Sequence, residues 1–165
     1  MPPSRKPAVP AAERTPLASL SEGPVHGIVG YQLAQAAIVT DQVFDEQAGD
    51  SGLRRVEFTL LALVQANPDV TARQLSRALA VTPPNIALWL ERLEQRALVA
   101  RARSERDARV QHIRLTRAGA ALVQGTTQRL LAGERDALAS LSAAEQAMLV
   151  ELLHKVALAR RRGEA

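Results

Sequence analysis

The chain has 165 residues, enough for one domain with a single sizeable core and too few for two large independent cores. Aromatic residues make up only 2% of it, so the core must consist of Leu, Ala, Val and Ile, and the absence of cysteine excludes disulfides and thiolate metal sites. The net charge of +4 is unevenly distributed, because residues 71–117 hold ten arginines and four acidic residues. Such a basic segment is typical of a nucleic-acid-binding surface, and a solvated face is the alternative.

An N-terminal arm and a long helix open the chain. Residues 1–22 are rich in Pro and Ala and have no apolar period, so we expect a disordered or loosely ordered arm. No run approaches the roughly 18 apolar residues of a membrane span, and no secretory signal is apparent, so a cytoplasmic protein is expected. From Val25 to about Gln47 apolar residues recur at helical spacing, before "AGDSG" breaks the helix.

Two short helices are predicted next. The segment "LRRVEFTLLALVQANPD" repeats apolar residues along one face and ends at Asn67-Pro68, where a helix cannot comfortably continue. Thr71 is followed three residues later by Gln74, the spacing of a capping box, in which each side chain bonds the other residue's backbone N–H. A helix is therefore expected to start after Thr71.

The following helix is expected to begin at a second cap. Thr82 is the N-cap candidate, and Pro83 stands in the first turn, where a missing N–H is tolerated. Trp89 is expected to pack beside the core stripe, whose predicted members are Ile86, Leu90, Leu93 and Ala97. Two short helices joined by a tight turn, the second with polar residues outside, are typical of a helix-turn-helix.

A basic hairpin follows directly. The strand candidates "LVARA" and "VQHIRL" bracket "RSERDAR". A helix-turn-helix followed by a β-hairpin is the order of a winged helix, here at about residues 53–116. The predicted fold class is therefore mainly α with a small β-hairpin wing.

Two apolar helices complete the chain. Thr116 is expected to cap the first, and Ser142 with Glu145 forms a second capping-box spacing. The apolar stripe of the last helix consists of Met148, Leu149, Leu152, Leu153 and Val156. Helices at about 25–47 and 117–162 are more apolar than a small wing domain needs, so we expect them to form a homodimer; a monomer that buries them internally is the alternative.

The order of elements and several motifs resemble the MarR family of bacterial transcription regulators, over about residues 25–160. The resemblance is carried by "LERLEQRALVARARSERDARVQHIRLTRAGAAL", in which Asp107-x-Arg109 and Leu115-Thr116 with Gly119 match the family's wing signature. It implies a single domain at 23–165 that binds pseudo-palindromic operators as a homodimer, usually as a repressor associated with the nucleoid. It also implies release by a small aromatic acid or phenol.

The recognition helix is expected to read DNA with its first turn. Asn85 can pair with adenine, whereas Pro83 and Pro84 offer only apolar contact to thymine methyl groups or serve solely to start the helix. Thr82 occupies the same turn. Arg92 is a candidate phosphate contact, or part of an ordinary solvated face.

The wing is expected to enter the minor groove, whose negative potential attracts guanidinium groups. Arg106 and Arg109 are the candidates for insertion, and Asp107 is expected to hold Arg109 in place. Further phosphate contacts, each of which is alternatively a plain surface arginine, are expected from Arg73, Arg101 and Arg103.

An effector site is expected where the resemblance places it, beside the first helix. Its candidates are His26, Tyr31, Arg54 and Arg55, which can hydrogen-bond or charge-pair an aromatic carboxylate or a phenol. Capping and interfacial packing are the alternative roles of these four residues. No cofactor is expected.

Other functions are disfavoured by the sequence. The three histidines, His26, His112 and His154, are dispersed, and neither H-E-x-x-H nor a Gly-rich phosphate loop is present, so neither an enzyme nor a metal site is expected. A winged-helix regulator without an effector, or a winged helix that binds protein, remains the alternative. The salt dependence of binding would distinguish DNA binding from protein binding, because DNA binding releases counterions.

Overall fold

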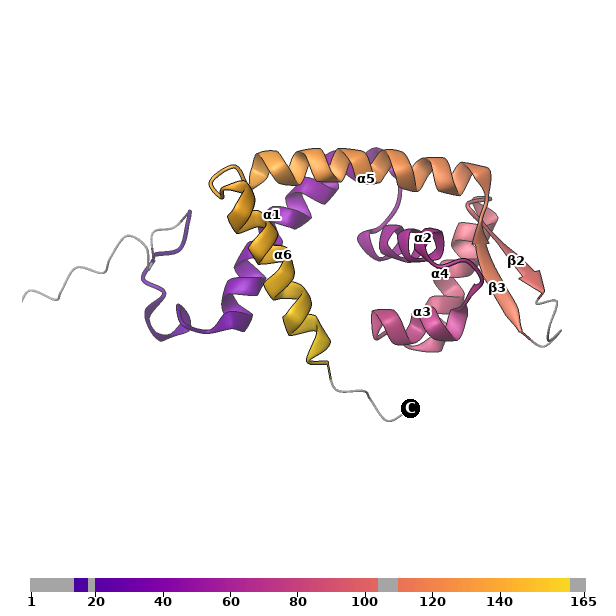
Figure 1. Ribbon diagram of the computed structural model, residues 1–165, viewed down its shortest axis with the longest axis horizontal. Helices are drawn as coiled ribbons and strands as arrows, with labels where there is room; N and C mark the ends of the chain where they lie inside the picture. Colours follow the sequence, from indigo (N-terminus) through magenta and orange to yellow (C-terminus); the bar gives the residue numbers. More distant parts are fainter. Residues whose placement is uncertain (1–13, 18–19, 104–109, 161–165) are drawn as a thin grey trace, which may run out of the picture. The chain divides into compact units, whose positions relative to one another are not determined.

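The computed structural model describes residues 14–17, 20–103 and 110–160. The chain divides into two units, residues 1–42 and 43–165, and the first long helix crosses their boundary. The elements in chain order are η2 (Gly23–Val25), α1 (Val29–Ala48), η3 (Gly49–Ser51), α2 (Arg55–Ala66), β1 (Val70–Thr71), α3 (Ala72–Leu79), α4 (Pro83–Gln95), β2 (Val99–Arg103), β3 (Gln111–Leu115), α5 (Arg117–Ala137) and α6 (Ala143–Leu158). The described residues thus form mainly helices and one small sheet, which confirms the predicted fold class (Figure 1).

In the first unit, α1 begins at Val29, four residues later than predicted. Pro24 lies in the 3-10 turn η2, and the backbone N–H of His26 donates to the carbonyl of Gly23 at 3.3 Å. Gly27 then favours a break, because glycine loses more conformational entropy in a helix than any other residue. Upstream, Arg14 and Ser21 form a β-bridge, whereas most of the predicted arm lies outside the described residues.

In the second unit, α2, α3 and α4 pack with the sheet around one apolar core. Its most deeply buried members, each at most 1% exposed, are Leu60, Leu61, Leu75, Ile86, Leu90, Leu93 and Ile113. The capping box at Thr71 forms as predicted, since the Gln74 N–H donates to Thr71 Oγ1 at 3.3 Å and the Thr71 N–H donates to Gln74 Oε1 at 2.9 Å. Trp89 packs against this core, as expected.

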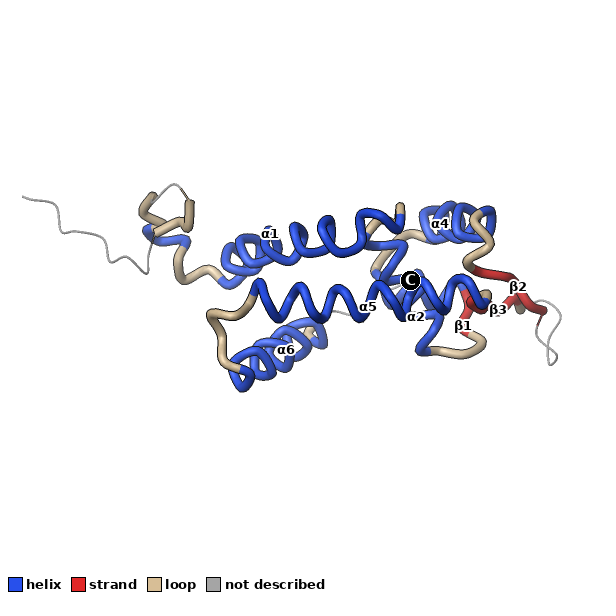
Figure 2. The backbone as a smooth tube through the Cα atoms, turned by 90° about the horizontal axis from the view of Figure 1, so that it is seen from above, coloured by secondary structure: helices blue, strands red, loops and turns tan. Residues whose placement is uncertain are grey.

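The sheet has three antiparallel strands in the order β1-β3-β2, visible as the short strands at one end of Figure 2. The hairpin pairs Val99 with Leu115 and Arg103 with Gln111 at its two described ends. The third strand, β1, pairs Val70 with Ile113 and is absent from the prediction. Two residues are too few to show an alternating pattern, and their pairing with a strand 43 residues later is a tertiary contact.

Two details of α4 differ from the prediction. Ala97 was expected in the core stripe, but α4 ends at Gln95 and Ala97 is exposed with φ +52°, so Leu98 enters the core instead. Thr82 is the N-cap residue, but its side chain makes no capping hydrogen bond. Pro84 has no N–H to donate, and the Asn85 N–H donates to the Thr82 carbonyl at 3.1 Å.

The last two helices begin at the predicted caps. Thr116 Oγ1 accepts from the Gly119 N–H at 3.0 Å, and Ser142 and Glu145 form a complete capping box. The apolar stripe of α6 is not covered in the single chain, where its five members are 36–53% exposed. No helix of the described ranges has the length and apolarity to cross a bilayer.

Candidate nucleic-acid interface

The first turn of α4 forms an exposed platform built largely from proline. Thr82, Pro83, Pro84 and Asn85 are all exposed, as reading of base edges requires. Helix N-termini usually also offer free backbone N–H groups to phosphate. Here Pro83 and Pro84 have none, and the Asn85 N–H bonds the Thr82 carbonyl. A contact of this turn with DNA stays a prediction, and it would depend mainly on side chains.

The outer face of α4 lies directly opposite its core stripe. Ile86, Leu90 and Leu93 are buried, and at 100° per residue the opposite side is occupied by Pro84, Leu88 and the exposed C-terminal turn. Leu88 is 45% exposed. The sequence prediction of DNA contacts did not include Leu88, although it lies between Asn85 and Arg92 on the same surface.

Arg92 is partly engaged by the core. Its Nη1 lies 4.0 Å from Oε1 of Glu57, a carboxylate on α2 that is almost fully buried. The other oxygen of Glu57 accepts from the Arg54 N–H at 3.0 Å and caps α2. Arg92 thus neutralises a buried charge while its side chain remains 41% exposed. A phosphate contact by the same guanidinium stays a prediction.

The strand arginines differ in their partners. Arg101 donates from Nε to Glu94 Oε2 on α4 at 3.2 Å, so this predicted phosphate contact forms an ion pair with the recognition helix. Arg103 is exposed at the end of β2, and Arg73 is exposed on the first turn of α3. Arg106, Asp107 and Arg109 lie outside the described residues, and their expected roles in the wing stay predictions.

The wing strand β3 is tied to the body by Arg114, which lay outside the predicted site. Its Nε donates to Asp69 Oδ1 at 2.8 Å, and its Nη2 binds the same oxygen. Hydrogen bonding from Arg114 lowers the pKa of the Asp69 carboxyl below its ordinary value. Asp69 precedes β1 in a left-handed conformation, φ +63°, which Asp tolerates better than most residues. The pair therefore joins the turn after α2 to the wing.

The junction between wing and α5 explains the Leu115-Thr116 and Gly119 motif physically. Thr116 Oγ1 donates to the Ala97 carbonyl at 2.7 Å, and the Thr116 N–H donates to the Leu98 carbonyl at 3.0 Å. A Cβ on Gly119 would lie 2.0 Å from the Leu98 carbonyl oxygen. Only glycine permits this approach, which holds the start of α5 against the segment between α4 and β2.

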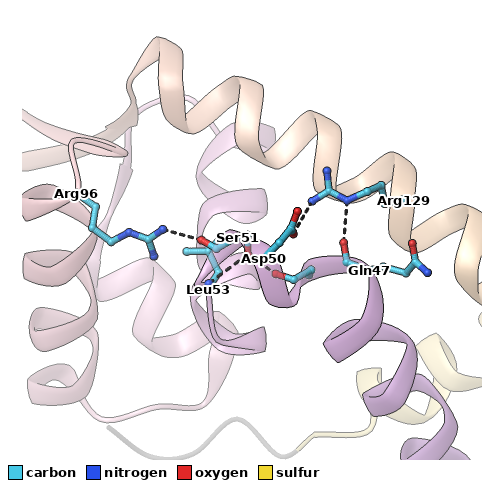
Figure 3. A network of polar contacts seen from close by, with 7 residues as sticks. Gln47, Asp50, Ser51, Leu53, Arg96 and Arg129 are labelled. Atoms are coloured by element: carbon cyan, nitrogen blue, oxygen red, sulfur yellow. Dashed lines mark hydrogen bonds and ion pairs between the residues drawn. The ribbon is translucent and has the colours of Figure 1, made fainter.

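The turn between α1 and α2 is bound by two arginines from other helices (Figure 3). Arg96, at the C-terminal end of α4, donates to the carbonyls of Ser51 at 2.7 Å and Gly52 at 3.0 Å. Arg129 of α5 donates from Nε to the Gln47 carbonyl at 2.8 Å and from Nη2 to Asp50 at 3.4 Å. The orientation of the recognition helix is thereby linked to α5 and to the end of α1.

The predicted effector residues of the first unit already hold a carboxylate. His26 Nδ1 lies 2.7 Å from Glu22 Oε2, and the Tyr31 hydroxyl donates to Glu22 Oε1 at 3.3 Å. Gln32 also donates to Glu22, and the Glu22 side chain is only 6% exposed. These bonds, that from His26 first, lower the pKa of Glu22, while desolvation and the nearby carboxylate raise the pKa of Tyr31. Neither Glu22 nor Gln32 was predicted.

The two predicted effector arginines of the second unit have structural roles. Arg54 is the N-cap residue of α2, with its N–H bonded to Glu57. The Arg55 guanidinium lies over the Phe44 ring, 5.1 Å from its centroid, and Phe44 in turn packs against Phe58. Capping and packing, the alternative roles considered from the sequence, are therefore present. Effector binding by these residues stays a prediction.

A three-helix body with a recognition helix and a β-hairpin wing defines this chain as a winged helix-turn-helix protein. The family model for the MarR family matches residues 51–110, which span α2 to the wing. The transcriptional regulator PecS of Dickeya dadantii is 29% identical over 127 residues, covering 75% of this chain and 76% of PecS.

Solved structures agree with this assignment. The transcriptional repressor CouR, bound to a 23-mer DNA duplex, has a TM-score of 0.76 at 27% identity, covering 84% of this chain and 98% of CouR. BpsR of Bordetella bronchiseptica, whose structure concerns regulation of DNA binding by 6-hydroxynicotinic acid, has a TM-score of 0.72 at 25% identity, covering 81% and 96%. The chain is thus similar to winged helix-turn-helix transcriptional regulators of the MarR family, both in the sequence of its winged helix and in its fold.

Proposed function

We propose that this protein is a repressor that binds a pseudo-palindromic operator as a homodimer and is released by a small aromatic acid or phenol. The observation that carries the proposal is the exposed outer face of α4 beside an arginine-rich hairpin, in a chain similar to the DNA-bound repressor CouR. The first turn of α4 would enter the major groove and the wing the adjacent minor groove.

The homodimer is supported by the uncovered stripe on α6. Met148, Leu149, Leu152, Leu153 and Val156 recur at three- and four-residue intervals along one face. Burial of such a face against a second copy removes apolar surface from water, which stabilises the dimer by about 25 cal/mol for each Å² buried. Two recognition helices in a symmetric dimer would then read half-sites about one DNA turn apart, roughly 34 Å.

The effector class is supported by the contacts around Glu22. His26, Tyr31 and Gln32 converge on one carboxylate, so the same side chains have the donors that an aromatic acid requires. BpsR, at 25% identity, is described as regulated by 6-hydroxynicotinic acid, an aromatic ring with an acidic group. Arg54 and Arg55 are further candidates for the effector's charge.

Salt-dependent DNA binding tests this function. Duplex sites are selected from a random-sequence library with the full-length protein, and the affinity is measured by fluorescence anisotropy at stepwise salt concentrations. We expect log Kd to rise linearly with log salt, with a slope of about 0.9 per phosphate neutralised. Arg109→Ala should weaken binding and reduce this slope without unfolding the protein. Failure to enrich any sequence, or affinity independent of salt, would favour a protein-binding winged helix instead.

A further inference from the structure

The outer face of α4 carries one large apolar side chain that the core does not explain. Among the described residues of the winged helix, 53–103 and 110–116, Leu88 alone of the large apolar side chains is exposed, at 45%. The other exposed large apolar residues lie in the N-terminal unit, on α5 and on α6. Leu88 is therefore an exception within a domain whose other described leucines are buried or partly buried.

The position of Leu88 on the helix limits what it can contact. It lies one turn after Pro84 and three residues after Asn85, on the face opposite Ile86 and Leu90. This is the face that the N-terminal half of a recognition helix turns toward base edges. Asn85, at the start of the same face, has the donor and acceptor for adenine, whereas Leu88 has neither.

The only apolar group that a base pair presents in the major groove is the thymine C5-methyl. Leu88 and Pro84 have no hydrogen-bonding side-chain atoms, and neither Pro83 nor Pro84 has a backbone N–H to donate to a phosphate. A protein partner would need a wider apolar patch, since specific protein interfaces bury about 800 Å² on each side. One leucine beside Pro84 and Ala87 fits a methyl group better than a protein core.

We propose that Leu88 is a specificity-determining residue, which reads a thymine by apolar contact with its C5-methyl group in each half-site of the operator. This inference rests on the proposed DNA-binding function and adds a base and a residue to it. It requires a thymine at one symmetric position of both half-sites. Removal of that methyl should weaken binding about fourfold per half-site, the factor expected for exposing one buried CH₂-sized group.

Replacing thymine by deoxyuridine tests the contact, because only the methyl group is lost. The probe is the duplex selected with the wild-type protein, resynthesised with deoxyuridine at each thymine in turn. Wild type should discriminate at one symmetric position, and Leu88→Ala should bind both duplexes equally there. Leu88→Met should retain part of the discrimination. Leu20→Ala, the same truncation at an exposed site before η2, should retain all of it.

The outcomes separate this inference from the function on which it rests. If wild type enriches a site but binds the thymine and deoxyuridine duplexes equally, the methyl contact is wrong while the DNA-binding function stands. Discrimination that Leu88→Ala leaves intact would assign the methyl contact to another residue and overturn the role of Leu88. Failure to enrich any site would overturn both. Circular dichroism of Leu88→Ala should match wild type, because the side chain is outside the core.

Discussion

Arg96 donates a hydrogen bond from Nη2 to the backbone carbonyl of Ser51, over a distance of 2.7 Å. Because Nη1 also bonds the Gly52 carbonyl, one guanidinium ties the end of the recognition helix to the turn before α2. Arg129 holds the same turn from α5 (Figure 3). A change at this turn would therefore be transmitted to the helix that is proposed to read DNA.

Replacing Arg96 should loosen this connection. Arg96→Met removes both hydrogen bonds, and we expect the free energy of unfolding to fall by about 1 kcal/mol, since the group is exposed and water compensates in part. Arg96→Lys should not restore it fully, because one ammonium cannot reproduce the planar fork of a guanidinium. Urea denaturation measures the change. Arg77→Met, at an exposed position of α3, serves as the control, and equal midpoints for Arg77→Met and Arg96→Met would contradict the assigned role.

Gly119 should tolerate no side chain. Gly119→Ala places a Cβ 2.0 Å from the Leu98 carbonyl oxygen, so the start of α5 or the wing must move. We expect a loss of about 2 kcal/mol or more in the free energy of unfolding. Thermal and urea unfolding provide the measurement.

Gly125 in the same helix offers a matched control. A Cβ there would meet only the end of the Arg129 side chain, at 3.9 Å. Gly125→Ala should therefore stabilise the protein by about 0.5–1 kcal/mol, through the better helix propensity of alanine. Equal effects of the two substitutions would show that helix propensity, and not the contact with Leu98, governs Gly119.

Ala80 in the helix-turn-helix turn is strained. It caps α3 with φ +53°, in the left-handed region that costs non-glycine residues roughly 1–2 kcal/mol. Ala80→Gly should therefore raise the free energy of unfolding by about 0.5–1 kcal/mol, the glycine's greater unfolded-state entropy offsetting part of the gain. Ala78→Gly, inside α3, should lower it by about 1 kcal/mol. A destabilising Ala80→Gly would contradict this account of the turn.

The capping box of α6 should be sensitive to acid. Hydrogen bonds from the Ser142 hydroxyl and N–H lower the pKa of Glu145 below its ordinary value. A lowered pKa in the folded state means that the carboxylate contributes stability above its unfolded-state pKa, and this contribution is lost as the pH falls through the folded-state pKa.

Glu145→Gln isolates this contribution. The difference in unfolding free energy between wild type and the variant should be constant near neutral pH and shrink as the pH falls below about 4. Thermal unfolding between pH 7 and pH 3 measures it. A difference that stays constant across this range would show that the charge of the Glu145 carboxylate does not contribute to the stability of α6.

Local sequence signals predicted most of the fold. The caps at Thr71, Thr116 and Ser142 are each encoded within four residues, and the structure has all three. The predictions that failed concern contacts between residues far apart in the sequence, or the local backbone conformation. The strand β1 exists because Val70 pairs with Ile113, and Ala97 lies outside the core because α4 ends at Gln95 and Ala97 takes a left-handed conformation.

The candidate site was less accessible to sequence reasoning. Arg92 and Arg101 were recognised as basic and exposed, but their partners Glu57 and Glu94 are brought to them by packing of α2 and by the start of β2. Leu88 was not among the predicted DNA contacts, because the prediction weighted charge and hydrogen bonding. The reason to propose a role for Leu88 is the exposure of its side chain, which is known only from the folded domain.

The central claim, a symmetric dimer that places two recognition helices on one operator, is tested most directly by hydroxyl-radical footprinting of the selected duplex. The account predicts two equivalent protected regions whose centres are about 10–10.5 base pairs apart, related by the operator's pseudo-palindrome. A single unsymmetrical protected region, or no protection at concentrations that saturate the anisotropy signal, would contradict it.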